Sequence, residues 1–331
     1  LLPMTPRKFA MNTIIRKMLK SDLQQVNGMI SRAFTQGRID DGYAHTEVPM
    51  CRADFIQMYF SQRPDGCFVI EELGQIRGAA FCHVWGNTGW IGPLAIAPEK
   101  HHLGLGKDLA QHAVNYLRSI GCKTIGIETN PRSSRNLGFY GKIGFVPSAL
   151  SIDMVRPVPS TPSPEDKSVH KKIFYSRLSA ADKKEFKLRV WNLVNLVALD
   201  VDYTDLINST DEHHFGETIL FMRKGAPIGV AVLQTKPSLV EEQNSFLRIV
   251  SFAAHPKTPP FYFSYFLNDI ILFAKDRALN RILARVPMYS PHAFRILLEN
   301  KYRVINSDLR MTLEGYGEQR QNSAFHINRW V

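Results

Sequence analysis

Two glycines one residue apart are the first feature of this sequence that could do chemistry. Gly104 and Gly106 end the segment LAIAPEKHHLGLG, residues 94–106, in which an apolar run passes through a proline into a turn and an amphipathic helix. The first amides of a helix have no partner within the helix and lie at the positive end of its dipole, so they can hold a phosphate. Glycine lets the main chain approach such an anion closely. Residues 103–107 are therefore predicted to form an anion site built from the backbone.

A second motif lies downstream at residues 139–145, where the sequence reads FYGKIGF. In it, Tyr140 stands four residues before a Gly-Phe pair, near the end of a predicted helix. The glycine turn after an apolar strand, followed at this distance by the tyrosine motif, resembles the GNAT superfamily of N-acetyltransferases. The resemblance covers about residues 13–155 and implies an acyl-CoA loop at residues 101–107.

The resemblance also implies which residues hold the acyl-CoA. In the family, the strand before the glycine turn supplies backbone amides to the acyl carbonyl and the pantetheine arm, which here falls on residues 94–96. The chain departs from the family where His101 and His102 replace an Arg or Gln followed by Gly, and where Ser133 replaces an Asn. The two histidines could donate to a pyrophosphate or could be exposed loop residues without a ligand. The implied cofactor-binding residues are Leu94, Ala95, Ile96, His101, His102, Leu103, Gly104, Leu105, Gly106, Lys107, Ser133, Asn136, Phe139 and Tyr140.

Acyl transfer from a thioester needs a proton donor for the departing thiolate and a neutral nucleophile. Tyr140 is the implied general acid, because a phenol with a pKa near 10 can donate a proton and regain it; the alternative is that it packs against the cofactor and positions it. Glu128, at the end of a predicted strand, is the candidate base, and pairing with Arg132 or Lys123 is the alternative. His83 is a second candidate base, although a lone strand histidine is more often a hydrogen-bonded core residue.

Hydrophobic periodicity and turn residues predict the elements that must position these groups. They indicate an α/β (α+β mixed) fold, with a mixed, mostly antiparallel sheet and helices on both of its faces. The expected strands are 13–19, 67–73, 75–85, 90–97, 123–129 and 145–155, and the expected helices are 21–35, 53–61, 104–120 and 132–143.

A proline-rich stretch, residues 156–171, separates two halves that share one order of elements. A shift of about 158 residues places Pro98 on Pro256 and keeps the order strand, loop, helix, strand, helix, strand. Such self-similarity indicates a duplicated domain. The sequence thus predicts two tandem GNAT-like domains: an N-terminal domain with the acyl-CoA site over 1–155 and, after the linker, a degenerate copy over 172–331.

The second copy keeps the order of helices and strands but lacks the glycine residues of the predicted anion site. Where the first copy has HHLGLG at residues 101–106, the second has PPFYFS at residues 259–264. Proline removes amide donors, and bulky rings keep a phosphate away from the main chain. We expect this copy to bind no CoA, and we expect its aromatic run to pack in a core or between domains rather than to form a ligand box.

Composition limits the classes of partner. The net charge of +11 is spread along the chain without a basic tail, which favours an anionic small ligand over nucleic acid. No apolar run is long enough to span a bilayer, so we expect no membrane contact and a cytoplasmic location. No cluster of His or Cys has the spacing of metal ligands, so no metal is expected.

Two functions fit these observations. The first is an acyl-CoA-dependent N-acyltransferase that uses acetyl-CoA (or another acyl-CoA) and acts on a small-molecule amine or a peptide amine. The alternative is a non-catalytic acyl-CoA-binding sensor or interaction protein. The acidic and aromatic stretch at residues 34–50 could suit a cationic amine or be a solvated loop, and a homodimer is left open.

Overall fold

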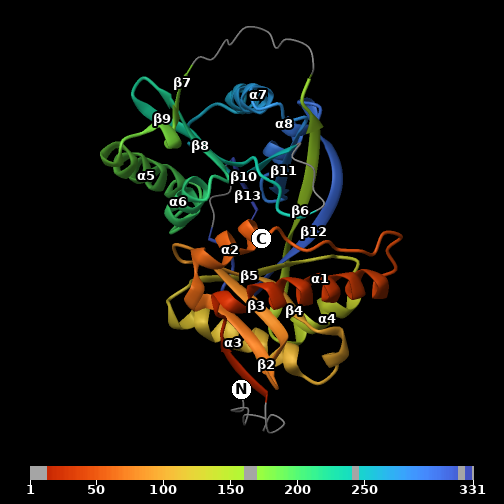
Figure 1. Cartoon of the computed structure of the whole chain (residues 1–331). Helices are drawn as coiled ribbons and strands as arrows, with labels where there is room; N and C mark the ends of the chain where they lie inside the picture. The colour runs from red at the N-terminus through yellow and green to blue at the C-terminus, as the bar shows by residue number, and fades with distance from the viewer. Residues whose placement is uncertain (1–12, 160–169, 241–245, 320–324, 330–331) are drawn as a thin grey trace. The chain divides into compact units, whose positions relative to one another are not determined.

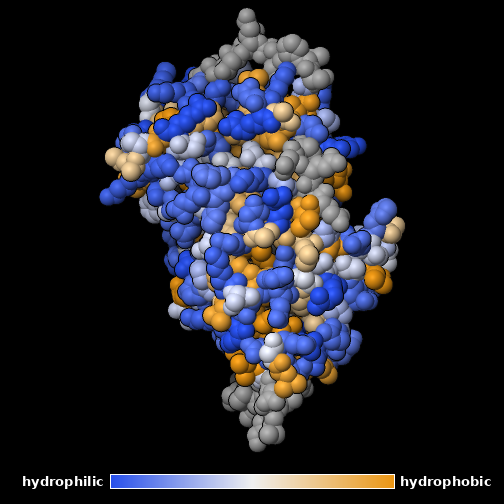
Figure 2. All heavy atoms as spheres, in the orientation of Figure 1, coloured by the Kyte–Doolittle hydropathy of each residue, from blue (hydrophilic) through white to orange (hydrophobic). Residues whose placement is uncertain are grey.

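The computed structural model describes residues 13–159, 170–240, 246–319 and 325–329 (Figure 1). These residues pack as two compact units, one within residues 1–83 and 91–120 and the other within residues 84–90 and 121–331. The hydropathy view shows one face on which hydrophilic residues predominate and apolar ones are scattered (Figure 2). Within the described ranges, no helix combines the length and the apolar character needed to cross a membrane.

The first unit packs helices against an antiparallel sheet. β1 pairs with β2, and β2 pairs with β3. Helix α1 places Val26, Met29 and Ile30 in one core with Val69 of β2 and Phe81 of β3. The elements are β1 (Thr13–Lys17), α1 (Leu23–Asp40), α2 (Ala53–Gln62), β2 (Cys67–Glu72), β3 (Gln75–Trp85), β4 (Thr88–Ile96) and α3 (Leu105–Ser119); β3 and β4 continue into the second unit.

The second unit contains the rest of the chain. Its strands lie in the order β5, β12, β6, β11, β10, β9, β8, β7, and β13 pairs with β10. The first residues of β4 pair in parallel with β5. The elements are β5 (Thr124–Thr129), α4 (Ser134–Lys142), β6 (Phe145–Pro157), β7 (Lys171–Phe174), α5 (Ala180–Asn195), α6 (Thr204–Glu212), β8 (Gly216–Arg223), β9 (Ala226–Gln234), β10 (Phe246–Ala254), α7 (Tyr262–Lys275), β11 (Arg281–Pro287), α8 (Pro291–Glu299), β12 (Arg303–Leu313) and β13 (His326–Asn328).

Helices cover both faces of the sheet formed by β8, β9 and β10. Leu220 and Val230 pack in one core with α5 and α6. Phe221 and Ala231, the next residues along the same strands, pack in another core with α7 and α8. Because successive side chains of a strand point to opposite faces, the two helix pairs lie on opposite sides of this sheet. The mixed fold with helices on both faces is confirmed.

The two halves of the sequence exchange strands within the second unit. β12, from the second half, pairs with β5 and with β6 of the first half. β6 in turn pairs with β12 on one side and with β11 on the other. Each half therefore completes the other's sheet, and a cut in the connecting segment would not separate these strands.

The predicted elements agree with the structure except at their ends. Helix α1 continues to Asp40 instead of ending at residue 35, and there the Gln36 side chain donates to the Asp40 carboxylate at 2.8 Å. The expected linker 156–171 begins in β6 and ends in β7, and its residues 160–169 lie outside the described ranges. The compact units do not divide the chain at residue 156, so the tandem boundary of 1–155 and 172–331 stays a prediction about the duplicated sequence.

Candidate functional site

The predicted anion loop of the first unit begins a helix with a left-handed turn. Gly104 has a φ of +84° and precedes α3, whose first residue is Leu105. His102 also has a positive φ, of +64°. Leu109, Ala113 and Leu117 bury one face of α3. The burial of that face holds the helix in place and leaves its first turn at the loop.

Ion pairs and a hydrogen bond tie down the segment that leads into this turn. Glu99 pairs with Arg77 at 2.9 Å, and Lys100 pairs with Glu72 at 2.5 Å. The His101 ring Nε2 lies 3.1 Å from the carbonyl oxygen of Ile96, to which it can donate. The loop is thus anchored on both β2 and β3, and His101 contacts the strand that the resemblance assigns to the acyl group.

The loop has the features that a pyrophosphate requires. Leu103 is 59% exposed, and His102 and Lys107 are exposed, so an anion can reach the first turn of α3. The amides of the first helical turn have no acceptor four residues earlier within the helix. His102 and Lys107 can add donors around them. The residues present therefore fit a phosphate group of CoA.

His83, the second candidate base, is a core residue of the first unit. Its Nε2 lies 2.9 Å from the carbonyl oxygen of Gly92, and its ring centroid lies 4.1 Å from that of Tyr59. Burial lowers the pKa of His83 to about 4. This environment matches the hydrogen-bonded core histidine that the sequence left open and makes His83 a weak base.

Tyr140 lies on α4 in the second unit, among aromatic rings. Its ring centroid is 5.0 Å from that of Phe139 and 6.0 Å from that of Phe145. The side chain is half-buried, and burial raises the pKa of the phenol to about 12. The phenol therefore keeps its proton at neutral pH, as a proton donor must.

Ser133 and Asn136, both predicted to contact the cofactor, have hydrogen-bond partners at the start of α4 and at the end of β5. Ser133 is fully buried and is the N-cap of α4, where its Oγ accepts from the Asn136 amide at 3.5 Å. The Asn136 side-chain amide donates to Oγ1 of Thr129 at 3.4 Å. These contacts hold α4 at the end of β5, and the cofactor contacts of Ser133 and Asn136 stay predictions.

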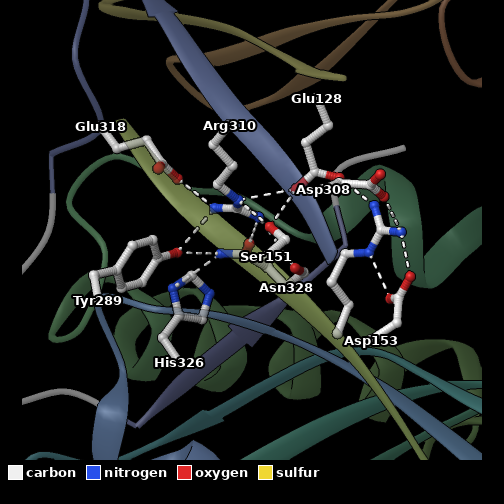
Figure 3. A network of polar contacts seen from close by, with 10 residues as sticks. Glu128, Ser151, Asp153, Tyr289, Asp308, Arg310, Glu318, His326 and Asn328 are labelled. Carbon is white, nitrogen blue, oxygen red and sulfur yellow. Dashed lines mark hydrogen bonds and ion pairs between the residues drawn. The ribbon is translucent and has the colours of Figure 1, made fainter. Parts of the chain in front are cut away.

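Glu128 lies in a buried polar network of the second unit (Figure 3). Ser151 donates to its carboxylate at 2.7 Å and Arg310 donates at 2.9 Å, while Arg285 forms an ion pair with the other carboxylate oxygen. The charge partners are therefore two arginines of the second half, and neither Arg132 nor Lys123 is among these contacts. Arg285 also contacts Asp153 in a two-pronged pair at 2.8 and 2.7 Å.

Burial and the neighbouring charges together set the pKa values of the carboxyl groups in this network. Burial acts to raise the pKa of Glu128, but Arg285 and Arg310 outweigh it and the pKa lies below its ordinary value. For Asp308, burial prevails and the nearby Glu128 and Asp153 add to it, so its pKa is raised. Glu128 is thus a stable carboxylate and a weak base, which favours an electrostatic role over proton abstraction.

Sequence reasoning missed the arginines that hold Glu128. Arg310 is fully buried, and it also donates to Glu318 at 2.7 Å, to the Tyr289 hydroxyl at 3.2 Å and to Asn328. Arg285 lies within a predominantly apolar strand, and Arg310 has an apolar residue on each side along its strand. An arginine among apolar strand residues was the available signal of a buried polar network, because a buried charge needs a charged or hydrogen-bonding partner.

The start of α7 in the second half differs from the start of α3. Phe261, which precedes the helix, has a right-handed backbone with φ −64° where Gly104 has φ +84°. The Tyr262 and Phe263 amides donate to the carbonyl oxygens of the two preceding prolines, at 3.0 and 3.1 Å. Phe263 and Phe266 of the aromatic run are buried in the core of this half, as the packing interpretation expected, whereas Phe261 and Tyr265 are exposed.

One family model matches part of the chain, and several solved structures share its fold. Residues 31–145 match the model of the Acetyltransferase (GNAT) family. A Pyrococcus horikoshii protein with a proposed acetyltransferase function has a similar structure, with 14% identity, 98% of each chain covered and a TM-score of 0.66. A GCN5-related N-acetyltransferase from Sphaerobacter thermophilus has 12% identity, 96% of this chain and 100% of that chain covered, and a TM-score of 0.61. A search of curated proteins finds no match.

A tandem arrangement is also represented among the similar structures. A tandem GNAT protein from the clavulanic acid biosynthesis pathway has 10% identity, 91% of this chain and 98% of that chain covered, and a TM-score of 0.57. At these identities the solved structures show a shared fold. The family match covers the region that contains the anion loop and Tyr140. Residues 31–145 therefore match the GNAT acetyltransferase family, and this match supports an acyltransferase.

Proposed function

We propose that this protein is an N-acetyltransferase that moves the acetyl group of acetyl-CoA to an amine. One observation carries the proposal. Inside the region matched to the GNAT family, the chain builds a helix start with a left-handed Gly104 and an exposed first turn. Tyr140 lies in the same matched region and keeps its proton at neutral pH.

Each predicted residue has a chemical role in this proposal. The amides of Leu105 and Gly106 bind the pyrophosphate, and the His102 and Lys107 side chains add donors at its edge. The backbone of residues 94–96 holds the pantetheine arm and the acyl carbonyl, where one amide aimed at the developing oxyanion contributes about 3 to 4 kcal/mol. Ser133, Asn136 and Phe139 belong to the same set by family resemblance.

The reaction needs one bond formed and one broken. The amine nitrogen attacks the thioester carbonyl carbon, the carbon–sulfur bond breaks, and the Tyr140 phenol gives its proton to the departing sulfur. A protonated amine gives one proton to solvent before it attacks, and after the attack the nitrogen gives up a second proton, which restores the Tyr140 phenol directly or through solvent. Glu128 was the candidate base, but with its lowered pKa we assign it a charge-stabilising role in the second unit.

The acceptor is proposed to be a cationic amine, either a small molecule or a peptide. Ser31 donates to the Val48 carbonyl at 2.6 Å, and the Val48 amide donates to Oγ1 of Thr35 at 2.9 Å, so the end of the loop after α1 is fixed on that helix. His45 and Glu47 remain exposed on this loop. The exposed Glu47 carboxylate on a fixed loop favours a positively charged acceptor.

The first test replaces both glycines of the anion loop by valine. CoA at 100 times its Kd stabilises a folded protein that it alone binds by about 2.7 kcal/mol, which raises the melting temperature. The double variant Gly104→Val and Gly106→Val should lose this CoA-dependent rise, because the side chains keep the phosphate from the amides and valine is strained at a positive φ. Thermal unfolding with and without CoA measures the change.

The matched control for the glycine variants is Gly28→Ala. Gly28 lies in α1, where an added methyl group would meet only ordinary contacts, the nearest at 3.6 Å from the Arg32 side chain. This variant should keep the full response to CoA. A folded double glycine variant that still responds like the wild type would place the cofactor elsewhere.

The stoichiometry of CoA binding is a separate prediction. Because prolines and aromatic rings replace the anion loop in the second half, and because the first amides of α7 already have acceptors, titration calorimetry should find one CoA per chain. Two equivalent sites per chain would show that the second half has kept a cofactor site.

A further inference from the structure

The two halves contain strands of equal length at corresponding places. β4 spans Thr88–Ile96 and β10 spans Phe246–Ala254, so both ends are shifted by 158 residues. On this shift, residues 252–254 correspond to residues 94–96, the stretch proposed to hold the acyl group and the pantetheine arm. The backbone partners of residues 252–254 therefore show what has become of the second cofactor site.

The C-terminal strand of the same chain pairs with these residues. β10 pairs in parallel with β11 only over residues 246–249, and residues 251–253 pair antiparallel with β13. The Ala254 amide donates to the Phe325 carbonyl at 3.0 Å, and the Arg329 amide donates to the Val250 carbonyl at 2.9 Å. An extended segment of the protein itself thus takes the hydrogen bonds of this part of β10 on the edge opposite β9.

The aromatic run that replaced the glycines helps to hold this segment. Phe325 and Ile327 lie in the core that contains α7, and the Phe325 ring centroid is 5.4 Å from that of Phe263. On the same shift, Phe263 corresponds to Leu105 at the start of α3. The aromatic residues that stand in place of the first half's anion loop therefore supply apolar surface on which β13 packs.

The other side of β13 is polar and reaches the Glu128 network. The His326 ring Nε2 and the Tyr203 hydroxyl are 2.6 Å apart, and Asn328 accepts from Arg310, which in turn contacts Glu128. Figure 3 shows His326, Asn328 and Tyr289 gathered on one side of Arg310, with Glu128 on the other. Alternation along a strand explains how one short segment serves both the core and this network.

We infer that residues 325–329 are an internal ligand of the second half: the chain's own extended backbone takes the place that corresponds to the acyl-CoA arm in the first half. The second half is therefore closed to acyl-CoA by two features, the lost anion loop and the seated strand. The same strand braces Arg310 and so connects the C-terminal segment to Glu128.

Hydrogen exchange of the full-length chain, followed by mass spectrometry with and without CoA, tests this inference. Without CoA, the Ala254 amide should exchange at least about 100-fold more slowly than in an unfolded chain, because it donates to the Phe325 carbonyl of the seated segment. Adding CoA should slow exchange in residues 94–107 and leave residues 250–254 unchanged. Rapid exchange of the Ala254 amide without CoA, or slowing of residues 250–254 by CoA, would overturn the inference.

This experiment separates the inference from the proposed function. If CoA slows exchange nowhere while the Ala254 amide is protected, the proposed function fails and the internal ligand stands. A variant adds a second measurement: in folded Ile327→Asp, a charge in the core should release β13 and speed the exchange of the Ala254 amide by at least about 10-fold. Val304→Asp, at a position 50% exposed on β12, is the control and should change nothing. An unchanged rate in folded Ile327→Asp contradicts the inference, and if that variant does not fold, the wild-type comparison decides.

Discussion

Replacing Tyr140 by phenylalanine is expected to lower turnover by about 100- to 10,000-fold, the usual contribution of a general acid. The ring contacts with Phe139 and Phe145 survive the change, so the affinity for CoA should stay close to that of the wild type. The reason is that only the proton donor is lost. Steady-state kinetics with acetyl-CoA and an accepted amine, together with calorimetric titration of CoA, measure the two effects.

Tyr116→Phe is the matched control for this prediction. Tyr116 loses the same hydroxyl, which donates to Asp65 at 2.8 Å in the first unit, and turnover should remain near that of the wild type. Full activity of Tyr140→Phe would reduce Tyr140 to the packing role that the sequence also allowed. Equal losses in both variants would point to a general effect of the lost hydroxyl on the fold.

The second large effect is expected for Arg310→Met. Removing one partner of a buried ion pair costs about 3 to 5 kcal/mol, because the other charge stays buried without compensation. Here Glu128 and Glu318 would both lose the guanidinium of Arg310. Urea unfolding should show the loss as a lower midpoint.

The control for Arg310→Met is Arg189→Met, in an exposed i,i+4 pair with Glu185. Exposed pairs contribute roughly 0 to 1 kcal/mol, so this variant should unfold near the wild-type midpoint. Equal midpoints for wild type and Arg310→Met would contradict the buried network.

The same network predicts how stability depends on pH. Arg285 and Arg310 lower the pKa of Glu128, so this carboxylate contributes stability above its ordinary pKa of about 4.3. That contribution is lost as the pH falls through the lowered value in the folded state. In Arg310→Met much of it is already absent, so acid should destabilise the variant less steeply than the wild type.

Local signals in the sequence sufficed for most of the elements. A run of mostly apolar residues after a turn marked β3 at residues 75–85 with its observed ends, and helical spacing marked the buried face of α3. The turn with Gly104 and Gly106 marked the start of α3, where the structure places Gly104 in the left-handed region. These features depend on neighbours within a few residues.

The long-range features could not be predicted in the same way. Glu128 and Arg310 are 182 residues apart, and they meet only because β12 lies between β5 and β6. The exchanged strand order depends on the pairing of whole strands, which periodicity does not reveal. For the same reason the sequence suggested Arg132 or Lys123 as partners of Glu128, since both are near it in the chain.

The measurement that tests the central proposal most directly is release of the CoA thiol from acetyl-CoA across a panel of small-molecule and peptide amines. We expect the release of CoA thiol to depend on an amine and to yield the N-acetylated amine in equal amount. In Tyr140→Phe the rate of release should fall by at least about 100-fold. Saturable binding of acetyl-CoA with no amine-dependent release across the panel would contradict this proposal and would favour a non-catalytic acyl-CoA-binding protein.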